Sequence, residues 1–561
     1  MKSNGGLSRR GFLKGAVTVG GAGAAGLVGS SALVGLGVQT ADAATGKARG
    51  AKADNSIYPQ AEPIPKLSVP AKWDYQVDVV VAGGGGAGLA AAVAAAQRGA
   101  KVVVLEKNAF CGGDTSIAMV FSGNVGSRLQ QKLGIKTPSL ADRVMNVGYN
   151  NLVTPNPTCG RDGTMVRQIT EYQADTIHWL EDLGVVFSTQ RVLGLPAPGI
   201  LHCPIDPEHP KEDWYYWHPH TARGFTEALE KKAKALGVLI LKEHPATGLI
   251  TSGKRVVGIA ARNIDGKAVH TKAKAVILAT GGFGANMDML KKYCQPRRVE
   301  GARYWGMPGA TGDGIRMAQP LGAALRQMEE VEIWDGGAVR ELGATGVYTA
   351  PNQLVRQKSL TVNKKGKRFF NESLYKGYLY SFQSAQTIYQ PGLVSFTVFD
   401  SNIISKEDII SKLGATFCEY PCPWFEKQFD EYLAKGVIKK ADTLPELAKM
   451  LGIDPDGLVK TVKRYNELCD KGEDTDFFKE AKFMHPIRKP PFYGVGQKGG
   501  SLFNTYGGLV VDEKFHVLDE EWDPIPGLFV AGENAAGGAS VAYGITMGRL
   551  TGEFASGEVI G

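Results

Sequence analysis

One segment constrains the fold of this chain more than any other, residues 77–107, which read VDVVVAGGGGAGLAAAVAAAQRGAKVVVLEK. The run from Val77 to Ala82, interrupted only by Asp78, is typical of a strand that is buried on both faces. An Ala-rich helix is predicted to follow it, and a second buried strand is predicted at 101–105. A strand, a glycine turn, a helix and a second strand in this order predict an α/β fold with a Rossmann-like sheet.

The turn between the first strand and the helix has the spacing G-x-G-x-x-G, at Gly83, Gly85 and Gly88. In such a turn the first glycine makes the tight bend, the second lets a pyrophosphate approach the backbone, and the third lets helix and strand pack closely. The free N–H groups at the start of the helix attract the phosphates. Glu106 closes the second strand, where a carboxylate accepts hydrogen bonds from ribose hydroxyls. The residues predicted to bind a dinucleotide here are Gly83, Gly85, Gly86, Ala87, Gly88, Glu106 and Lys107.

Further segments indicate which dinucleotide binds. They are EKNAFCGGDTSIA from Glu106, AVILATGGFGAN from Ala275, PGATGDGIRMA from Pro308, LTVNKKGKRFFNE from Leu360 and IPGLFVAGENAAGG from Ile525. On these segments, the chain from about Val77 to its end resembles the FAD-dependent flavoprotein group that contains soluble fumarate reductases, urocanate reductases and 3-ketosteroid dehydrogenases. The resemblance implies that the cofactor is FAD.

The resemblance also implies which residues bind FAD outside the fingerprint. Glu533 would contact the ribityl chain or its surroundings, and the last helix would begin between Gly537 and Val541, under the pyrimidine edge of the flavin. A helix N-terminus at that edge stabilises the negative charge of the reduced ring. The further residues implied are Gly113, Asp114, Thr115, Ala279, Thr280, Gly281, Gly312, Asp313, Gly507, Glu533, Ser540 and Val541.

The domain order is a third implication of the resemblance. Residues 73–325 and 503–561 would form a discontinuous, Rossmann-like FAD-binding domain. Residues 326–502 would form an inserted α+β capping domain, and the substrate would lie between the two. The expected fold class is therefore α/β with an α+β cap.

The first residues of the sequence have the pattern of a transport signal. Residues 1–43 are predicted to be a twin-arginine signal peptide, because SRRGFLK precedes a Gly- and Ala-rich stretch and an Ala-Asp-Ala site that ends at Ala43. Cleavage there would leave residues 44–72 as a linker. An uncleaved membrane anchor stays open as the alternative, although seven glycines between positions 20 and 37 dilute the apolar stretch. The twin-arginine route exports folded proteins, so the predicted location is the periplasm or the outer face of the cell membrane.

Composition limits the partners. The formal net charge of +8 is modest for this length, and the Lys and Arg residues are dispersed among Asp and Glu residues. No nucleic-acid partner is therefore predicted. The seven cysteines are few and odd in number, and Cys418 and Cys422 complete no zinc, iron–sulfur or haem pattern, so no metal site is predicted. The sequence has no second dinucleotide fingerprint and no haem motif. A separate electron donor, such as a membrane-anchored cytochrome, is therefore expected beside a small-molecule substrate.

Reduction of an activated C=C bond needs a hydride for one carbon and a proton from a placed acid for the other. In the fumarate reductases that the chain resembles, the acid is an arginine a few residues after the N-E of a GKRFVNE stretch, and ketosteroid Δ1-dehydrogenases place a tyrosine near that point. Here the sequence continues NESLYKGYLY, which makes Tyr375 and Lys376 the candidate donors and Tyr378 and Tyr380 weaker ones. A surface loop without a catalytic role stays open as the alternative.

The cationic groups that would bind a dicarboxylate are missing. The His-Thr-x-Gly-Gly of the fumarate reductases reads Asn-Thr-Tyr-Gly-Gly at 504–508, and no Arg occurs between Glu533 and Arg549. The charges of fumarate would be left unpaired in a dry site, so a neutral substrate is predicted. The side chains expected around it are Trp334, Asn504, Tyr506 and Tyr543.

The predicted reaction is thus reduction of a C=C bond conjugated to a carbonyl in a neutral, aromatic or steroid-like enone. A 3-ketosteroid dehydrogenase acting oxidatively stays open, as does a flavin electron-transfer subunit without substrate chemistry of its own. His218 and His220 are interpreted either as packed or solvated histidines or as a pair with one member near the flavin.

Overall fold

A computed structural model describes residues 62–118, 125–144, 163–187, 222–299, 303–338, 357–374, 386–403, 429–430 and 432–560. The predicted signal peptide, the side chain of Trp334 and the candidate residues Tyr375, Lys376, Tyr378, Tyr380, His218, His220, Cys418 and Cys422 lie outside this description. Within it, no helix has both the length and the apolar character needed to cross a membrane.

Over the described residues a nine-stranded sheet runs in the order β1-β5-β6-β7-β2-β3-β4, with β17 beside β7 and β16 beside β17. The strands are β1 (Leu67–Ser68), β2 (Tyr75–Ala82), β3 (Val102–Leu105), β4 (Leu239–Leu241), β5 (Ala246–Ser252), β6 (Arg255–Arg262), β7 (Ala268–Leu278), β16 (His516–Leu518) and β17 (Pro524–Val530). β2 pairs in parallel with both β3 and β7, and the end of β7 pairs in parallel with β17. The predicted strands at 77–82 and 101–105 are β2 and β3, so the predicted α/β fold is confirmed.

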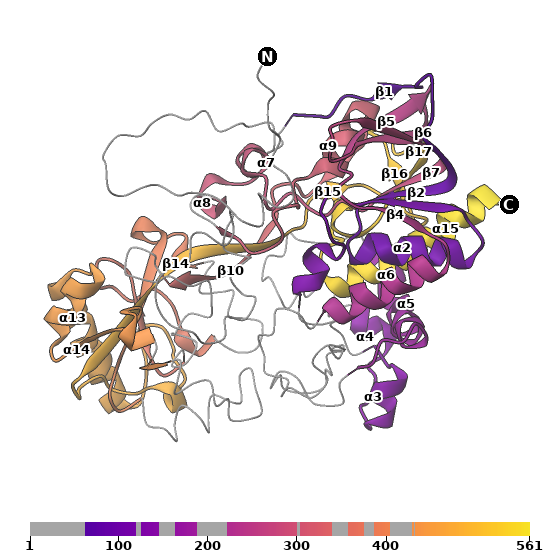
Figure 1. Cartoon of the computed structure of the whole chain (residues 1–561). Helices are drawn as coiled ribbons and strands as arrows, with labels where there is room; N and C mark the ends of the chain where they lie inside the picture. The colour runs from indigo at the N-terminus through magenta and orange to yellow at the C-terminus, as the bar shows by residue number, and fades with distance from the viewer. Residues whose placement is uncertain are drawn as a thin grey trace, which may run out of the picture. The chain divides into compact units, whose positions relative to one another are not determined.

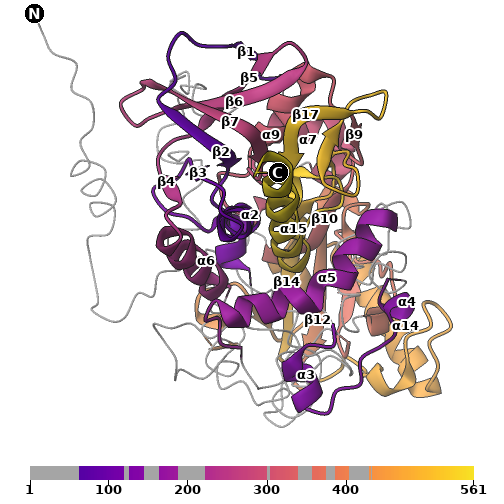
Figure 2. The ribbon, with the colours of Figure 1, turned by 90° about the vertical axis from the view of Figure 1, so that its right-hand side faces the viewer.

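Two helices pack together against this sheet and meet through small residues, α2 (Gly86–Gln97) and α15 (Val541–Ile560) (Figure 2). A Cβ on Gly548 would lie 2.1 Å from the carbonyl oxygen of Ala87, and a Cβ on Gly552 would lie 2.2 Å from that of Ala91. Larger side chains would therefore push the helices apart. α6 (Arg223–Ala235) packs beside α2, and α5 (Gly163–Asp182) packs beside α15. The shorter helices are α3 (Arg128–Lys132), α4 (Leu140–Val144), α7 (Met287–Tyr293), α8 (Pro296–Val299) and α9 (Asp313–Ala318).

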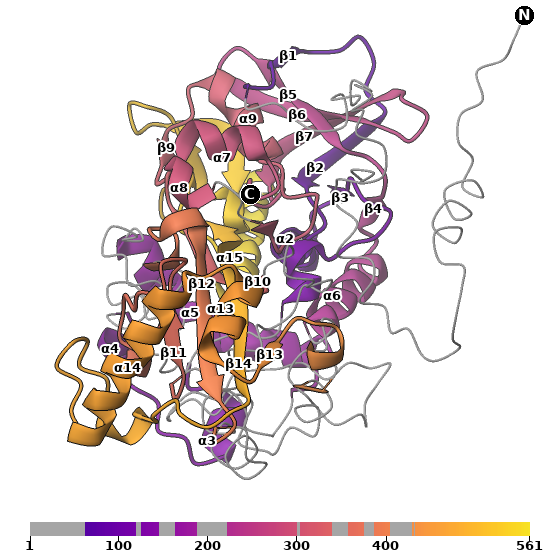
Figure 3. The ribbon, with the colours of Figure 1, turned by 90° about the vertical axis from the view of Figure 1, so that its left-hand side faces the viewer.

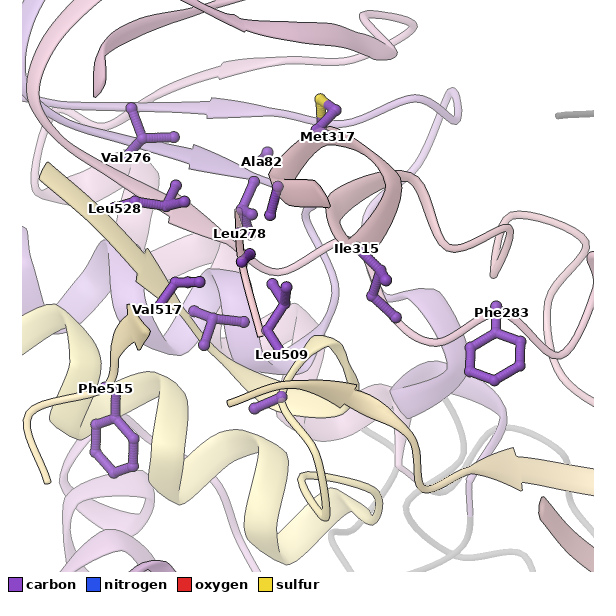
Figure 4. Close-up of a cluster of buried hydrophobic side chains, with 14 of the residues drawn as sticks. Ala82, Val276, Leu278, Phe283, Ile315, Met317, Leu509, Phe515, Val517 and Leu528 are labelled. Carbon is purple, nitrogen blue, oxygen red and sulfur yellow. The ribbon is translucent and has the colours of Figure 1, made fainter. Parts of the chain in front are cut away.

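A large hydrophobic cluster involves one face of the sheet (Figure 4). Val276 and Leu278 of β7 and Leu528 of β17 are fully buried, and Leu528 is the direct partner of Val276 in the pairing of these strands. Side chains from α9 and from the hairpin around β16 complete the cluster, including Ile315, Met317, Phe515 and Val517. The cluster thus holds the turn before α9 close to the carboxyl ends of the parallel strands.

The residues between β7 and β16 in the sequence supply a six-stranded sheet in which β14 pairs with four other strands; β10 and β14 are labelled in Figure 1. Its strands are β8 (Arg303–Tyr304), β10 (Val331–Ala338), β11 (Leu360–Val362), β12 (Val394–Asp400), β13 (Lys439–Ala441) and β14 (Phe492–Thr505). α13 (Leu444–Leu451) and α14 (Pro455–Lys471) lie beside this sheet (Figure 3). Their buried leucines belong to the same hydrophobic cluster as residues of β11 and β12. After β14 the chain enters β15 (Gly508–Leu509), which pairs with β9 (Leu325–Arg326).

The GKRFFNE stretch belongs to a buried network of charges next to this sheet. Arg368 Nη2 lies 2.6 Å from Glu372 Oε2 and 2.7 Å from Asp474 Oδ2. Lys479 Nζ donates to the carbonyl oxygen of Ser359 at 2.7 Å and lies 3.8 Å from Glu372 Oε2. The side chains of Glu372, Asp474 and Lys479 are fully buried, and burial lowers the pKa of Lys479 to about 8. The network joins the GKRFFNE stretch to the segment after α14.

His516 gives the stability of the fold a specific pH dependence. Its Nδ1 lies 2.7 Å from Asp512 Oδ2 and its Nε2 lies 3.0 Å from Glu558 Oε1, which connects β16 to the end of α15. Burial alone would lower the pKa of His516, but the hydrogen bonds to the two carboxylates outweigh burial and hold this pKa above its ordinary value. A histidine whose folded pKa is raised stabilises the fold fully below its unfolded pKa, about 6.5, and loses this contribution as pH rises through the folded pKa.

We therefore expect wild type to exceed the His516→Gln variant in free energy of unfolding by more at pH 5.5 than at pH 8.5. Urea unfolding followed by circular dichroism at the two pH values measures this difference. Glu558→Gln removes one of the two partners and should reduce the pH dependence without abolishing it. A difference between wild type and His516→Gln that is equal at both pH values would contradict the assignment.

Candidate functional site

The glycine fingerprint joins β2 to α2. Gly83 has a φ of +110°, a conformation that favours glycine, and a Cβ on it would lie 2.1 Å from the carbonyl oxygen of Ala279. A Cβ on Gly88 would lie 1.9 Å from the carbonyl oxygen of Gly83, so helix and strand meet with no room for a side chain. No side chain caps the N-terminus of α2, so its first N–H groups are available to bind an anion.

Gly85 marks an open cradle beside this N-terminus. A Cβ there would have one neighbour within 4 Å, the carbonyl oxygen of Gly112 at 3.9 Å, and its φ of −74° suits any residue. The protein alone leaves this space open, as a close approach of pyrophosphate to the backbone requires. The Gly112 turn lies alongside the fingerprint, because the N–H of Gly112 donates to the carbonyl oxygen of Gly84 at 2.9 Å. Thr115 from the same turn lies against Gly86.

Glu106 is buried at the carboxyl end of β3. Its Oε2 accepts a hydrogen bond from the N–H of Gly84 at 2.8 Å, and its Oε1 accepts one from the N–H of Asn108 at 2.7 Å. Burial raises the pKa of Glu106, while these two N–H groups act in the opposite direction. The carboxylate is thus held beside the fingerprint, where a ribose would lie.

Lys107 and Asp313 form an ion pair, with 2.9 Å between Nζ and Oδ2. Lys107 Nζ also donates to the hydroxyl of Thr311 at 2.8 Å. Gly312, with a φ of +73°, makes the turn into α9 that places Asp313 there. The pair connects the end of β3 with the second glycine turn, as the assignment of both residues to one cofactor requires.

Asn534 connects three further predicted segments, although it was not among the residues predicted from the sequence. Its Oδ1 accepts hydrogen bonds from the N–H and, at 3.1 Å, the hydroxyl of Thr280, and its Nδ2 donates to the carbonyl oxygen of Gly281 at 2.8 Å. The hydroxyl of Thr280 in turn accepts from the N–H of Gly314 at 2.9 Å. Asn534 is fully buried and directly follows Glu533, so its position in the AGEN turn was the available signal.

Two acidic side chains face this part of the site, Glu533 and Asp114. Glu533 Oε1 accepts from the N–H of Thr505 at 2.7 Å and from its hydroxyl at 3.0 Å. Removal of water and the nearby charge of Asp114 raise the pKa of Glu533 to about 8. Burial likewise raises the pKa of Asp114, which accepts hydrogen bonds from the hydroxyl of Tyr304, at 2.7 Å, and from the N–H of Met307. Tyr304 is a second residue that was not predicted from the sequence, since no local motif marks it.

The last helix begins at Val541, at the C-terminal end of the range predicted. Ser540 before it has a φ of +120°, an uncommon value for a residue other than glycine, and its Oγ accepts from the N–H of Tyr543 at 3.3 Å. Tyr543 is buried within the large hydrophobic cluster. The ring of Tyr506 packs against Ala539, so Tyr506 lies beside the start of α15.

Glu332 contacts two of the residues that were predicted to lie around the substrate, Asn504 and Tyr506. Its Oε2 accepts a hydrogen bond from Asn504 Nδ2 and one from the hydroxyl of Tyr506 at 3.1 Å. Glu332 and Tyr506 are buried, whereas Asn504 is half-buried. Gly507 follows Tyr506 and packs closely against the backbone of Met328, because a Cβ on Gly507 would lie 2.4 Å from Met328 Cα. Glu332 was not predicted, although an acidic residue between Val331 and Ile333 was a usable signal.

The structure thus brings the predicted cofactor residues to the carboxyl ends of the parallel strands. The residues gathered there are Gly83, Gly85, Gly86, Ala87, Gly88, Glu106, Lys107, Gly113, Asp114, Thr115, Ala279, Thr280, Gly281, Gly312, Asp313, Gly507, Glu533, Ser540 and Val541. Asn504 and Tyr506 lie beside them, and Tyr375 and Lys376 are outside the described residues. The cradle at Gly85, the uncapped α2 and the held carboxylate of Glu106 fit a dinucleotide such as FAD.

Comparison with known proteins agrees with this geometry. The family described as FAD binding domain matches residues 78–545, so the chain belongs to this family. It is 29% identical to "Fumarate reductase (cytochrome)" of Shewanella frigidimarina over 86% of this chain and 77% of that protein. It is 28% identical to "Vinyl phenol reductase" of Lactiplantibacillus plantarum over 84% of this chain and 92% of that protein.

Among solved structures, the 3-ketosteroid-Δ4-(5α)-dehydrogenase from Rhodococcus jostii RHA1 matches with a TM-score of 0.66 and 27% identity, over 88% of this chain and 100% of that one. The resemblance to this flavoprotein group is therefore confirmed. The protein is an FAD-dependent oxidoreductase of a family that acts on C=C and CH–CH groups.

Proposed function

We propose that this oxidoreductase is an exported enzyme that reduces a C=C bond conjugated to a carbonyl in a neutral, aromatic or steroid-like substrate. The relatives support reduction of a C=C bond, since the names of two of them state fumarate and vinyl phenol as substrates. Vinyl phenol is neutral and aromatic. The absence from this sequence of the cationic groups that would bind a dicarboxylate likewise favours a neutral substrate.

One observation carries the preference for a neutral substrate: the position of the fumarate reductases' histidine holds Asn504, bound to the carboxylate of Glu332. An oxygen-rich wall of this kind offers no positive charge to a dicarboxylate. Arg549, the first arginine after Glu533, is used elsewhere, because its Nε lies 3.0 Å from Glu553 Oε1 and its guanidinium lies over Trp179. Arg368 is likewise held in the buried network with Glu372.

The reaction divides between cofactor and chain. FAD, when reduced, supplies the hydride for one carbon of the double bond. The chain binds and orients the substrate, and Tyr375 or Lys376 donates the proton to the other carbon. Both follow Glu372 within four residues, and the buried network holds Glu372 in place.

We expect Tyr375→Phe or Lys376→Ala to abolish turnover while FAD stays bound, because each variant removes one of the two candidate proton donors but no predicted FAD contact. Steady-state rates with the visible spectrum of the bound flavin measure both properties. Tyr389→Phe, at an exposed position, is the matched control and should keep full activity. Full activity in both the Tyr375 and Lys376 variants would contradict the assignment.

The remaining parts of the proposal concern organisation and partners. Residues 1–43 would direct export by the twin-arginine route, residues 44–72 would be a linker, and a separate donor such as a membrane-anchored cytochrome would supply electrons. Residues 73–325 and 503–561 would form the FAD-binding domain, and residues 326–502 would form the cap. The strand content supports this division, since β10 to β14 fall almost entirely within 326–502.

The experiment that tests the proposed function is anaerobic reoxidation of the dithionite-reduced holoenzyme by fumarate, urocanate, cinnamates and 3-oxosteroids. Fast reoxidation by a neutral enone is the expected result. Fast reoxidation by fumarate would overturn the argument from Asn504 and Glu332. No reoxidation by any of them would favour an electron-transfer subunit.

A second candidate is a 3-ketosteroid dehydrogenase that works oxidatively, supported by the match over 100% of the length of the Rhodococcus enzyme. Reduction of the oxidised flavin by a saturated 3-oxosteroid would identify this activity.

A further inference from the structure

We propose that Glu332 determines the specificity of the substrate site by holding Asn504 in one orientation, so that the site presents hydrogen-bond acceptors and selects an enone that carries a hydroxyl or N–H donor. This inference rests on the proposed function and narrows its substrate class. Glu332 acts through Asn504 and Tyr506 and is therefore a positioning residue.

The pairing of β10 with β14 brings the two side chains together. Glu332 is the direct partner of Asn504 in this antiparallel pair, and the next pair is Ile333 with Leu502. Phe503 is thus an extra residue in β14, which forms a β-bulge. Side chains of directly opposite residues leave the sheet on the same face, with Cβ atoms about 5 Å apart. The bulge fixes this register, so Glu332 and Asn504 stay in contact.

The chemistry of the two groups decides how the amide lies. An ionised carboxylate only accepts hydrogen bonds, whereas an amide has one donating end and one accepting end. Asn504 therefore turns its Nδ2 toward Glu332, which directs its Oδ1 away from the carboxylate. Asn504 is half-buried, and among the described residues no donor reaches this Oδ1. The amide is thus set to accept a hydrogen bond from a ligand.

Tyr506 is oriented by the same carboxylate. Its hydroxyl donates to Glu332 Oε2 at 3.1 Å, so the hydroxyl hydrogen is directed at Glu332. The ring packs against Ala539, next to the start of α15, and Thr505 between the two residues donates to Glu533. The Glu332 cluster, defined as Glu332, Asn504 and Tyr506, therefore lies next to the residues assigned to the flavin.

Such a site distinguishes ligands by their donors. A hydroxyl or N–H group on the substrate can donate to Asn504 Oδ1, whereas an ether or a carboxylate would bring one oxygen against another. Sites built to hydrogen-bond a substrate hydroxyl discriminate strongly against analogues that lack it, because the buried polar group is then left unpaired.

The test uses the FAD-loaded protein and two matched pairs of enones, 4-hydroxybenzylideneacetone with its 4-methoxy analogue and a 17-hydroxy-3-oxosteroid with its 17-methoxy analogue. Dissociation constants come from the change in flavin absorbance on binding, and KM and kcat come from reoxidation of the reduced enzyme. We expect wild type to bind the hydroxyl member of at least one pair more tightly by tenfold or more. In Glu332→Gln this preference should fall below about threefold, because a glutamine can donate as well as accept and lets the Asn504 amide turn over.

Two further variants keep the test decisive. Glu467→Gln removes one exposed negative charge on α14 and should keep the wild-type preference. Asn504→Leu removes the acceptor and should lose the preference even if Glu332→Gln fails to fold.

The inference is overturned if wild type does not distinguish the members of either pair, or if both site variants keep the preference with normal FAD content. In that case neutral enones would still reoxidise the flavin, and the proposed function would stand. Failure of every enone to bind or to reoxidise the loaded enzyme would instead overturn the proposed function, and this inference with it.

Discussion

Glu372→Gln should lower the free energy of unfolding by about 3–5 kcal/mol, because it removes one of the two carboxylates that neutralise buried Arg368 and the one that lies beside buried Lys479. Glu372 accepts from Arg368 at 2.6 Å and 3.1 Å and from the N–H of Thr361 at 3.0 Å, and its side chain is fully buried beside Lys479. The substitution keeps the shape of the side chain and removes its charge. Urea unfolding of the holoenzyme, followed by circular dichroism, measures the change.

The control for Glu372→Gln is Asp476→Asn, which breaks the exposed pair between Asp476 and Arg464, 2.7 Å apart. Exposed ion pairs contribute little, so this variant should unfold almost as wild type does. Equal stability of Glu372→Gln and wild type would show that the GKRFFNE network does not stabilise the fold. Loss of turnover in Glu372→Gln at a temperature where it is folded would connect the network to the segment with Tyr375 and Lys376.

Gly85→Ala should leave the apoprotein folded but weaken FAD binding by tenfold or more, about 1.4 kcal/mol or more. The protein has room for this Cβ, whose nearest neighbour would be 3.9 Å away, so the methyl group would occupy space that the pyrophosphate needs. Gly88→Ala should instead destabilise the apoprotein itself by about 3 kcal/mol, since its Cβ would lie 1.9 Å from a carbonyl oxygen. Thermal unfolding of the apoproteins and fluorescence titration with FAD separate the two effects.

Gly99→Ala is the matched control for these two variants. Gly99 has a φ of +91° and open space around a Cβ, so an alanine there costs about 1–2 kcal/mol of backbone strain and should leave FAD affinity unchanged. If Gly85→Ala bound FAD as tightly as wild type, the cradle would not be the phosphate site.

The sequence alone was sufficient for the β2–α2–β3 unit of the nine-stranded sheet. β2 and β3 were predicted to within two residues of their ends and an Ala-rich helix was predicted between them, because a buried run, a glycine turn and an Ala-rich helix are local patterns that each depend on neighbouring residues. The motif turns at Asp313 and Glu533 were also identifiable, since each carries its glycines within a few positions.

Only the tertiary structure decided which side chains meet across large separations. Glu332 and Asn504 are 172 positions apart, and Tyr304 and Asp114 are 190 apart, so no local period connects them. Their contacts follow from strand register, a bulge at Phe503 and the packing of turns at one edge of a sheet. A sequence pattern determines which residues one element buries, whereas the polar partners of those residues depend on how distant elements pack, and that is set by the free energy of the whole fold.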